Sequence, residues 1–304
     1  MAPIPEDQNA DVLLRIISDG TASETGAVFF RALVKNLSQA LGTYGAWVTE
    51  YLPETNRLRA LAFWLGEGYV EDYEYDVPGT PCEPAIKNKT YLHIPENVVE
   101  LFPGDPDLPR LGAVSYMGYP LLDPEQTVLG NIAVLDTKPM PDSFHNLALF
   151  RIFAARATAE LLRLGAEAEL NKREAQLRGV FDGAMDAIVE LDQDFRVLLM
   201  NSSARRLFAV PAEIMGGEFA SFLAEKDYRR VTELVRKLED RPSGERNIWI
   251  PNGLMVVNSL GEEVRTEATL SQLAADGSPC CHVLILRDVN ERYVAEKTIA
   301  SLAG

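Results

Sequence analysis

Cysteine and histidine are the residue types in this chain that could support metal or nucleophilic chemistry, and their spacing does not favour it. The 304 residues include three cysteines and three histidines, which form none of the paired spacings of a zinc site, a metalloprotease motif or a disulfide framework. The sequence also lacks a phosphate-binding loop of the form G-x-x-x-x-G-K-[ST]. We therefore expect a protein that is not an enzyme, with no catalytic residue and no metal site. The sequence identifies no cofactor.

Cys82 is the cysteine with the clearest chemical possibility. In GTPCEPAI it would occupy the first turn of a short helix, where backbone N–H groups and the helix dipole favour a thiolate. A thiolate would suit redox sensing, iron ligation or covalent attachment of a bilin. A buried cysteine is also a common packing residue, and the carboxylate of Glu83 beside it would raise the pKa of the thiol. We favour the packing role over the sensing role.

Aromatic and polar side chains elsewhere could line a cavity for a small ligand. Such side chains orient ligands in apolar pockets, and they serve a filled core equally well. Asn201 has a second interpretation as the N-cap of a short helix, which we favour. The ligand-binding candidates are Tyr75, Cys82, Tyr91, His93, Tyr116, Tyr119, Asn201 and Trp249.

The composition limits the partners that this chain can have. Its formal net charge of −16 repels a phosphate backbone, so we expect no direct contact with nucleic acid. No apolar run approaches the roughly 20 residues that a membrane span requires. The N-terminal stretch MAPIPEDQNADV has neither the basic nor the apolar region of a signal peptide. We expect a cytoplasmic protein without membrane contact.

One helix and two strand hairpins should position the candidates in the first part of the chain. A helix is expected over residues 23–42, where the apolar spacing and the end residues fit. Strand-like sequences at 44–52 and 57–65 flank the turn PETN, and those at 113–122 and 127–136 flank the turn DPEQ.

A long helical run follows Asp142. It is rich in Ala, Leu, Glu and Arg and contains no proline for about forty residues, which is typical of a coiled coil or a signalling linker. The apolar spacing shifts near residues 165–170, which indicates a stutter or a break into two helices. The first half could equally pack on its own sheet. The expected dimer seam consists of Ala157, Leu161, Leu164 and Ala168.

A second mixed region follows the long helix. Residues 187–192 and 196–201 predict a hairpin, short helices come next, and three strand-like segments end the region. Five antiparallel strands with helices on one side form an α+β layer fold.

Residues 178–292 resemble a PAS domain over essentially its whole length. The likeness rests on FDGAMDAIVELDQDFRVLLMNSSARRLF, with a short helix opening after the second strand, and on the closing RDVNER. That ending is similar to the strand end by which many PAS domains pass a signal onward. The resemblance implies that the signal exit consists of Asp288, Asn290 and Arg292, with Asn290 at a place where Thr or Ser is commoner.

Residues 10–160 resemble a GAF domain through GTPCEPAIKNKTYLHIPENVVELFPGDPDLPRLGAVSYMGYPLLDPEQTVLGNIAVLDTKPM. The two resemblances imply an α+β fold class with two domains, each an antiparallel sheet flanked by helices, joined by a long helical linker. The implied organisation is a GAF domain, a coiled-coil-like helical linker, a PAS domain and the start of a C-terminal output helix, at residues 1–160, 161–180, 181–290 and 291–304.

Together the resemblances imply the sensory module of a bacterial signal-transduction protein that forms a homodimer. It would bind a small ligand or a partner and signal through helices to an output domain outside this sequence. A sigma-54-type transcription activator is the favoured output, and a histidine kinase of a two-component system is the other. The alternative is a GAF–PAS dimerisation and protein-interaction module that binds no small ligand. A third reading is a redox or metal sensor built on Cys82.

Overall fold

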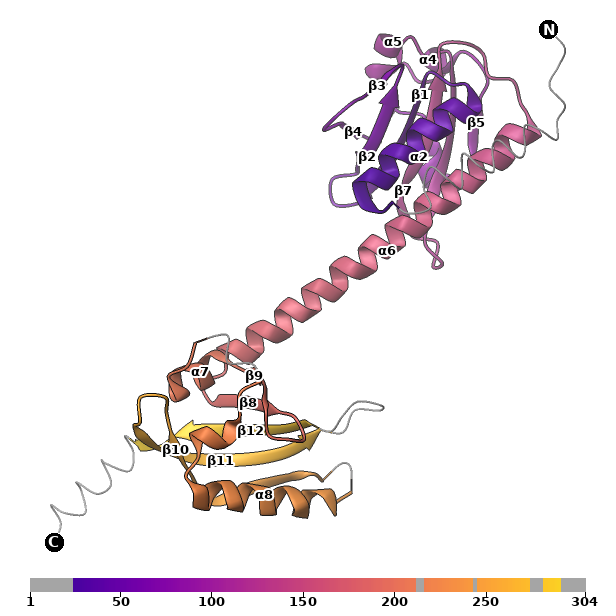
Figure 1. Cartoon of the computed structure of the whole chain (residues 1–304). Helices are drawn as coiled ribbons and strands as arrows, with labels where there is room; N and C mark the ends of the chain where they lie inside the picture. Colours follow the sequence, from indigo (N-terminus) through magenta and orange to yellow (C-terminus); the bar gives the residue numbers. More distant parts are fainter. Residues whose placement is uncertain (1–23, 212–215, 243–244, 274–280, 291–304) are drawn as a thin grey trace. The chain divides into compact units, whose positions relative to one another are not determined.

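The computed structural model describes four segments of the chain, residues 24–211, 216–242, 245–273 and 281–290 (Figure 1). Its contacts divide the chain into two compact units, residues 1–170 and 171–304. Each unit contains an antiparallel sheet with helices packed on it, and one long helix lies between the two sheets in the chain. The expected α+β class, with two sheet-and-helix domains and a long helical linker, is confirmed.

The first unit is built on a seven-stranded sheet of order β3-β2-β1-β7-β6-β5, with β4 paired to β2. Both predicted hairpins are present, because β1 pairs with β2 and β6 pairs with β7. The two hairpins join through antiparallel pairing of β1 with β7. The strands are β1 (Gly45–Leu52), β2 (Arg57–Leu65), β3 (Gly68–Tyr69), β4 (Glu74–Asp76), β5 (Leu92–Ile94), β6 (Ser115–Leu122) and β7 (Val128–Asp136).

Alternation along the strands gives this sheet two apolar faces. Successive side chains of a strand point to opposite sides. Ala46 and Val48 of β1 therefore pack in one apolar cluster, and Trp47 packs in another. The first cluster lies against α2 and the beginning of α6, and the second lies against α3, α4 and α5. The helices named here are α2 (Gly26–Leu41), α3 (Cys82–Asn88), α4 (Val98–Leu101), α5 (Asp107–Leu111) and α6 (Phe144–Gly183).

The long helix α6 is continuous, so the predicted alternative of two separate helices is wrong. Its beginning belongs to the core of the first unit, where Phe150, Phe153 and Ala154 are buried. These residues recur at helical spacing on one face, and that face meets the sheet of its own unit.

The expected dimer seam is partly used inside the first unit. Ala157 is fully buried in the same core, which corrects its expected place on a free dimer face. Leu161 and Leu164 are partly buried against this core, and Ala168 is exposed. The apolar spacing of this part of α6 therefore reflects packing on its own sheet.

The second unit has a five-stranded sheet of order β10-β11-β12-β8-β9, with all neighbours antiparallel. One face carries the core, in which the rings of Phe208, Phe219 and Phe222 pack together. The elements are β8 (Ala187–Leu191), β9 (Val197–Met200), α7 (Ser202–Phe208), a 3-10 helix (Phe219–Phe222), α8 (Glu225–Glu239), β10 (Asn247–Val257), β11 (Glu263–Leu273) and β12 (Cys281–Asp288).

Among the described helices, none combines the length and the apolar content that a membrane span requires. The predicted exit residue Arg292 and the predicted output helix at 291–304 lie outside the described residues.

A bulge in β10 fits α8 to the sheet. The register between β10 and β11 shifts between Ile250 and Leu254, and Gly253 there has a positive φ of 60°. The buried carboxylate of Asp227 in α8 accepts a hydrogen bond from the backbone N of Met255 at 3.2 Å. The bulge thus supplies the backbone donor that the helix carboxylate needs.

Gly253→Ala should destabilise the second unit strongly. A Cβ atom at Gly253 would lie 1.6 Å from the backbone oxygen of Thr266, so the strands would have to separate. We expect the free energy of unfolding to fall by about 3 kcal/mol or more. Gly261→Ala is the matched control, because its φ is also positive at 83° and no described atom crowds it. That variant should cost only about 1–2 kcal/mol. Equal losses in urea denaturation would contradict this account.

Candidate functional site

The first unit contains a small cavity between its sheet and helices α3 and α5. The space open to the centre of a water-sized sphere is about 20 Å³, enough for one molecule of that size. Aromatic rings form much of the wall, and a thiol and two carboxylates complete its polar part. These groups belong to Trp47, Phe63, Tyr73, Tyr75, Cys82, Asp105 and Asp107.

The thiol of Cys82 is the centre of a buried polar cluster beside this cavity. The hydroxyl oxygens of Tyr75 and Tyr116 lie 3.3 Å and 3.2 Å from Sγ. Asn131 donates from Nδ2 to Sγ and to the Tyr116 hydroxyl, both at 3.4 Å. Trp47 donates from Nε1 to the Tyr75 hydroxyl at 3.0 Å. Two of the sequence candidates, Tyr75 and Tyr116, therefore contact a third, Cys82.

Burial decides the state of the thiol. Desolvation has the largest effect and raises the pKa of Cys82. Hydrogen bonds with Tyr116 and Tyr75 lower this pKa, and their effect is smaller. Glu83 was expected to raise this pKa, but the nearby carboxylate that does so is Asp105. The carboxylate of Glu83 instead accepts a backbone hydrogen bond. The start of α3 does not overcome the burial, so the geometry favours the packing role of Cys82.

Two carboxylates, those of Asp105 and Asp107, line the cavity. Asp105 accepts hydrogen bonds from the backbone N of Asp107 at 2.9 Å and of Leu108 at 3.2 Å, at the start of α5. Tyr73 donates to the second carboxylate, Asp107, at 2.6 Å, and burial raises the pKa of Tyr73. Arg110 lies 3.3 Å from Asp107. Among the described residues no basic group forms an ion pair with Asp105, and burial raises the pKa of that carboxyl.

Three other sequence candidates lie on the opposite face of the sheet. Tyr91 and Tyr119 pack against the cluster under α2 and α6. The ring of His93 stacks on Tyr91 with centroids 6.2 Å apart, and its Nε2 lies 2.9 Å from the backbone oxygen of Met140. The structure therefore does not bring these residues to the cavity.

Several residues at the cavity and its polar cluster were missed by the sequence reasoning. Trp47 could have been found from strand alternation, because it stands between two aliphatic residues of β1 that face the other way. Tyr73, Asp105 and Asn131 give no such signal, because loops or distant strands bring them to the cluster. Trp249, a sequence candidate, is 58% exposed on β10 of the second unit.

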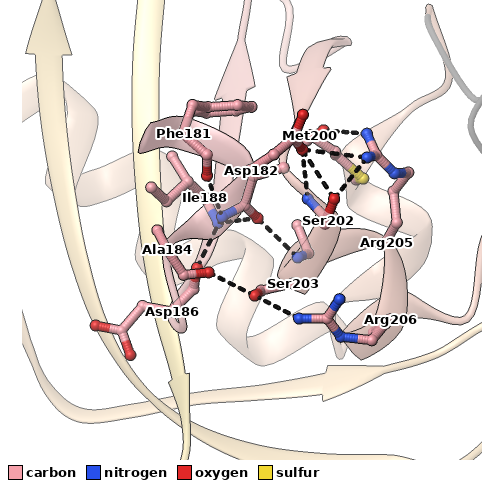
Figure 2. Close-up of polar contacts among 12 residues, drawn as sticks. Phe181, Asp182, Ala184, Asp186, Ile188, Met200, Ser202, Ser203, Arg205 and Arg206 are labelled. Carbon is pink, nitrogen blue, oxygen red and sulfur yellow. Dashed lines mark hydrogen bonds and ion pairs between the residues drawn. The ribbon is translucent and has the colours of Figure 1, made fainter. Parts of the chain in front are cut away.

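The second polar site surrounds Asn201, where α6 ends and the second sheet begins. Figure 2 shows residues of this site, among them Phe181, Asp186 and Ile188. Asn201 is fully buried and caps α7, because its Oδ1 accepts from the backbone N of Ala204 at 2.8 Å. The same oxygen accepts from the backbone N of Ile188 at 2.9 Å. Its Nδ2 donates to the backbone oxygens of Phe181 at 3.1 Å and Asp186 at 2.9 Å. One amide thus joins the end of α6, the start of β8 and the start of α7, which confirms the cap interpretation.

A second contact set fixes the last turn of α6 to α7. Figure 2 shows Asp182 facing Ser202 and Arg205. Asp182 accepts from the backbone N and the hydroxyl of Ser202, both at 2.9 Å, and lies 3.2 Å from Arg205. The Ser202 hydrogen bond is the main reason that the pKa of Asp182 is lowered. Ser203 adds a bond from its hydroxyl to the backbone oxygen of Ala184 at 2.6 Å.

The segment after α6 is also bonded to the end of β12. Asp186 forms a two-bond ion pair with Arg287, with N–O distances of 2.9 Å and 2.8 Å. Next in the chain, the Asp288 carboxylate accepts from the backbone N of Asn290 at 2.8 Å. The side chain of Asn290 accepts from the backbone N of Arg265 at 3.2 Å. Two of the predicted exit residues, Asp288 and Asn290, are therefore part of an ordered strand end.

Asn201→Ala should lower the free energy of unfolding of the second unit by about 2–4 kcal/mol. It removes one helix cap and leaves buried backbone groups without partners. Asn171→Ala in the exposed part of α6 is the control and should change stability by less than about 0.5 kcal/mol. Urea denaturation followed by circular dichroism measures both. Similar stabilities for the two variants would show that the Asn201 bonds do not hold this junction.

Asp105→Asn should raise the melting temperature at neutral pH. Because burial raises the pKa of Asp105, its folding contribution is present at low pH and is lost as the pH rises through the folded value. Asparagine keeps an acceptor for the two backbone N–H groups at the start of α5 and removes the charge. The advantage of the variant should therefore shrink as the pH falls toward the ordinary range of an aspartate. A gain independent of pH, in scans from acid to neutral, would contradict this assignment.

Comparison with known proteins agrees with this geometry. A family model described as the PAS fold matches residues 181–294. No curated protein is significantly similar to the chain in sequence.

Solved structures similar to the chain include proteins of both expected fold types. The GAF domain of an Acinetobacter phosphoenolpyruvate-protein phosphotransferase is 13% identical, and the match covers 56% of this chain and 99% of that one, with a TM-score of 0.44. The PAS domain of an HTR-like protein from Haloarcula marismortui is 20% identical, with 40% and 97% covered and a TM-score of 0.34. The E. coli DhaR(N)–DhaL complex contains a chain 14% identical, with 94% and 92% covered and a TM-score of 0.46. Residues 181–294 are thus similar to the PAS-fold family, and the solved structures that resemble the chain include GAF and PAS domains.

Proposed function

We propose that this chain is the sensory region of a bacterial signal-transduction protein. In this proposal the first unit senses a small ligand in the cavity beside Cys82, and the second unit relays the change toward a C-terminal output. The output domain is a sigma-54-type transcription activator or a histidine kinase. The chain itself catalyses no reaction in this scheme.

The observation that carries the proposal is that one helix takes part in both units. In the first unit, α6 contributes Phe150 and Phe153 to the core. In the second, its last turn is held by the bonds from Asn201 to Phe181 and from Ser202 to Asp182. A helix is hydrogen-bonded along its length. A displacement of its beginning is therefore passed to its end unless the helix bends or unwinds. This continuity supports a relay through α6.

The route onward uses the ion pair of Asp186 with Arg287. Asp186 also offers its backbone oxygen to Asn201, and the same amide donates to Phe181 in the last turn of α6. Asp186 therefore connects the end of β12 with the amide that binds the end of α6. A ligand can drive such a relay only if it binds one arrangement of these contacts more tightly than another. In this proposal, ligand binding in the cavity and the arrangement of the Asn201 contacts are coupled through one conformational equilibrium.

Acidic composition supports one further part of the proposal. With a net charge of −16, this chain would leave nucleic-acid contact to its output domain. The proposal also places the chain in the cytoplasm.

A chimera with a kinase tests the relay. The chain would be fused at its C-terminal end to the catalytic half of a characterised sensor histidine kinase, and autophosphorylation would be measured. Arg287→Gln removes the ion pair with Asp186 at a partly exposed site, so the variant should fold. We expect a change in rate of about fivefold or more, the lower range of an allosteric coupling. Glu71→Gln, which removes an exposed ion pair of the first unit, is the control. Equal rates for the parent and both variants would contradict the relay.

A second candidate function is a dimerisation and protein-interaction module that binds no small ligand. It is favoured by exposed apolar residues on α6, since Leu170, Leu177 and Val180 are 66%, 71% and 71% exposed. Spacings of seven and three residues are those of a coiled-coil seam. Native mass spectrometry of the purified chain separates the candidates. A retained extra mass supports the sensor, and a dimer at bare protein mass supports this second function.

Both candidates use a homodimer, and the exposed stripe on α6 tests it. Leu177→Glu with Val180→Glu should weaken dimerisation by about tenfold or more, because two buried apolar contacts would be replaced by charges. Gln176→Glu is the control, since it adds a charge at a neighbouring exposed position. Sedimentation velocity over a concentration series measures the association. An unchanged dimer would place the interface elsewhere.

A further inference from the structure

The cavity of the first unit has an electrostatic character that its packing does not explain. Four aromatic side chains line it, and each ring contacts the next in the series. The ring centroids of Trp47 and Phe63 are 5.3 Å apart, those of Phe63 and Tyr73 5.2 Å, and those of Tyr73 and Tyr75 5.2 Å. The face of an aromatic ring is negative, and it attracts a cation within about 6 Å of the centroid. A ring-lined wall of this kind favours a positive ligand.

Carboxylates strengthen this preference. Asp105 and Asp107 both line the cavity, and Asp105 is only 9% exposed. Asp105 accepts hydrogen bonds from two backbone N–H groups, both at Oδ1. A carboxylate has further lone pairs, which remain available to another donor. Among the described residues no Lys, Arg or His forms an ion pair with it. A buried carboxylate is costly unless it is paired with a positive group.

The remaining polar groups at this site act mostly as acceptors. Trp47 uses its only N–H on the hydroxyl of Tyr75, and Tyr73 uses its hydroxyl proton on Asp107. In the adjoining cluster around Cys82, the Oδ1 of Asn131 is fully buried and has no hydrogen-bond partner in the part of the chain that the structure describes. Negative ligands and ligands that only accept hydrogen bonds find few free donors here.

Size sets a further limit. The cavity has room for about one water-sized molecule. An ammonium ion has nearly that size, carries one positive charge and donates four hydrogen bonds. Larger quaternary cations exceed the space. A simple metal ion would need several coordinating oxygens, and among the described residues no group of three or more His, Cys, Asp or Glu side chains is placed to hold one.

We propose that this cavity is a binding site for a small ammonium-type cation, held by the rings of Trp47, Phe63 and Tyr73 and by the carboxylates of Asp105 and Asp107. The inference rests on the proposed sensory function of the same site and names the ligand class. Ammonium would neutralise Asp105 and hydrogen-bond to it, and would occupy the water-sized space that the rings line.

Titration of the full chain with ammonium chloride tests the proposal, with ionic strength held constant by sodium chloride. We expect saturable stabilisation in thermal unfolding. With ¹⁵N-labelled ammonium, we expect a bound proton resonance with nuclear Overhauser effects to the rings of Trp47 and Tyr73. Asp105→Asn should weaken binding by about tenfold or more, the loss of one charge-assisted hydrogen bond. Circular dichroism would verify that this variant is folded.

Matched controls make the outcome decisive. Glu71→Gln removes an exposed carboxylate of the same unit and should bind ammonium as the parent does. Asp107→Asn is a second cavity variant and should also bind less tightly. Absence of saturable binding, unchanged affinity in the folded Asp105→Asn variant, or equal stabilisation by potassium chloride would each overturn the proposal.

The result is separable from the test of the sensory function. If the kinase chimera responds to Arg287→Gln but ammonium does not bind, the ligand class is wrong and the relay stands. If ammonium binds with the expected dependence on Asp105 but never alters the output of the chimera, the site stands and the sensory function falls.

Discussion

The buried amide of Asn201 is the interaction on which the second unit and its connection to α6 depend. It donates two hydrogen bonds and accepts two. Three of its partners lie on α6, β8 and α7, and the fourth, Asp186, directly precedes β8. No hydrophobic residue of similar size could satisfy the backbone groups at this point, because each would lose a partner inside the fold. The surrounding Asp182 and Asp186 contacts are more exposed and rest on this arrangement. Without this amide, the carbonyl group of Phe181 in the last turn of α6 would lose this hydrogen-bond donor.

In the first unit the corresponding constraint is the alternation of side chains along β1, β6 and β7. Each strand contributes to two clusters at once, so the unit can pack α2 and α6 on one face and place α3 to α5 on the other. The two faces of the sheet therefore have different roles. One face of the sheet joins the helix that continues through the chain, and the other holds the cavity and its polar cluster. Trp47 and its neighbours in β1 show how a shift of one residue would exchange these faces.

The cavity combines two effects that usually oppose each other. Desolvation raises the pKa of Cys82, Asp105 and Tyr73, which favours their neutral forms. The backbone N–H groups at the start of α5 partly offset this for Asp105 and keep its oxygens fixed. The site is therefore ordered in advance, and a positive ligand would gain attraction without first ordering the wall.

Sequence alone determined much of the architecture. Strand alternation and turn residues predicted both hairpins of the first sheet, the PAS resemblance identified the second unit, and the helix-cap preference of asparagine located Asn201. These features are local, because each depends on residues within a few positions of one another. Only the tertiary structure decided which faces met. It buried Ala157 in its own unit, placed Tyr91 and His93 away from Cys82, and brought Asn131 and Asp105 to the cavity region. The physical reason is that periodicity tells which residues of an element share a face, whereas the pairing of distant strands decides what that face touches.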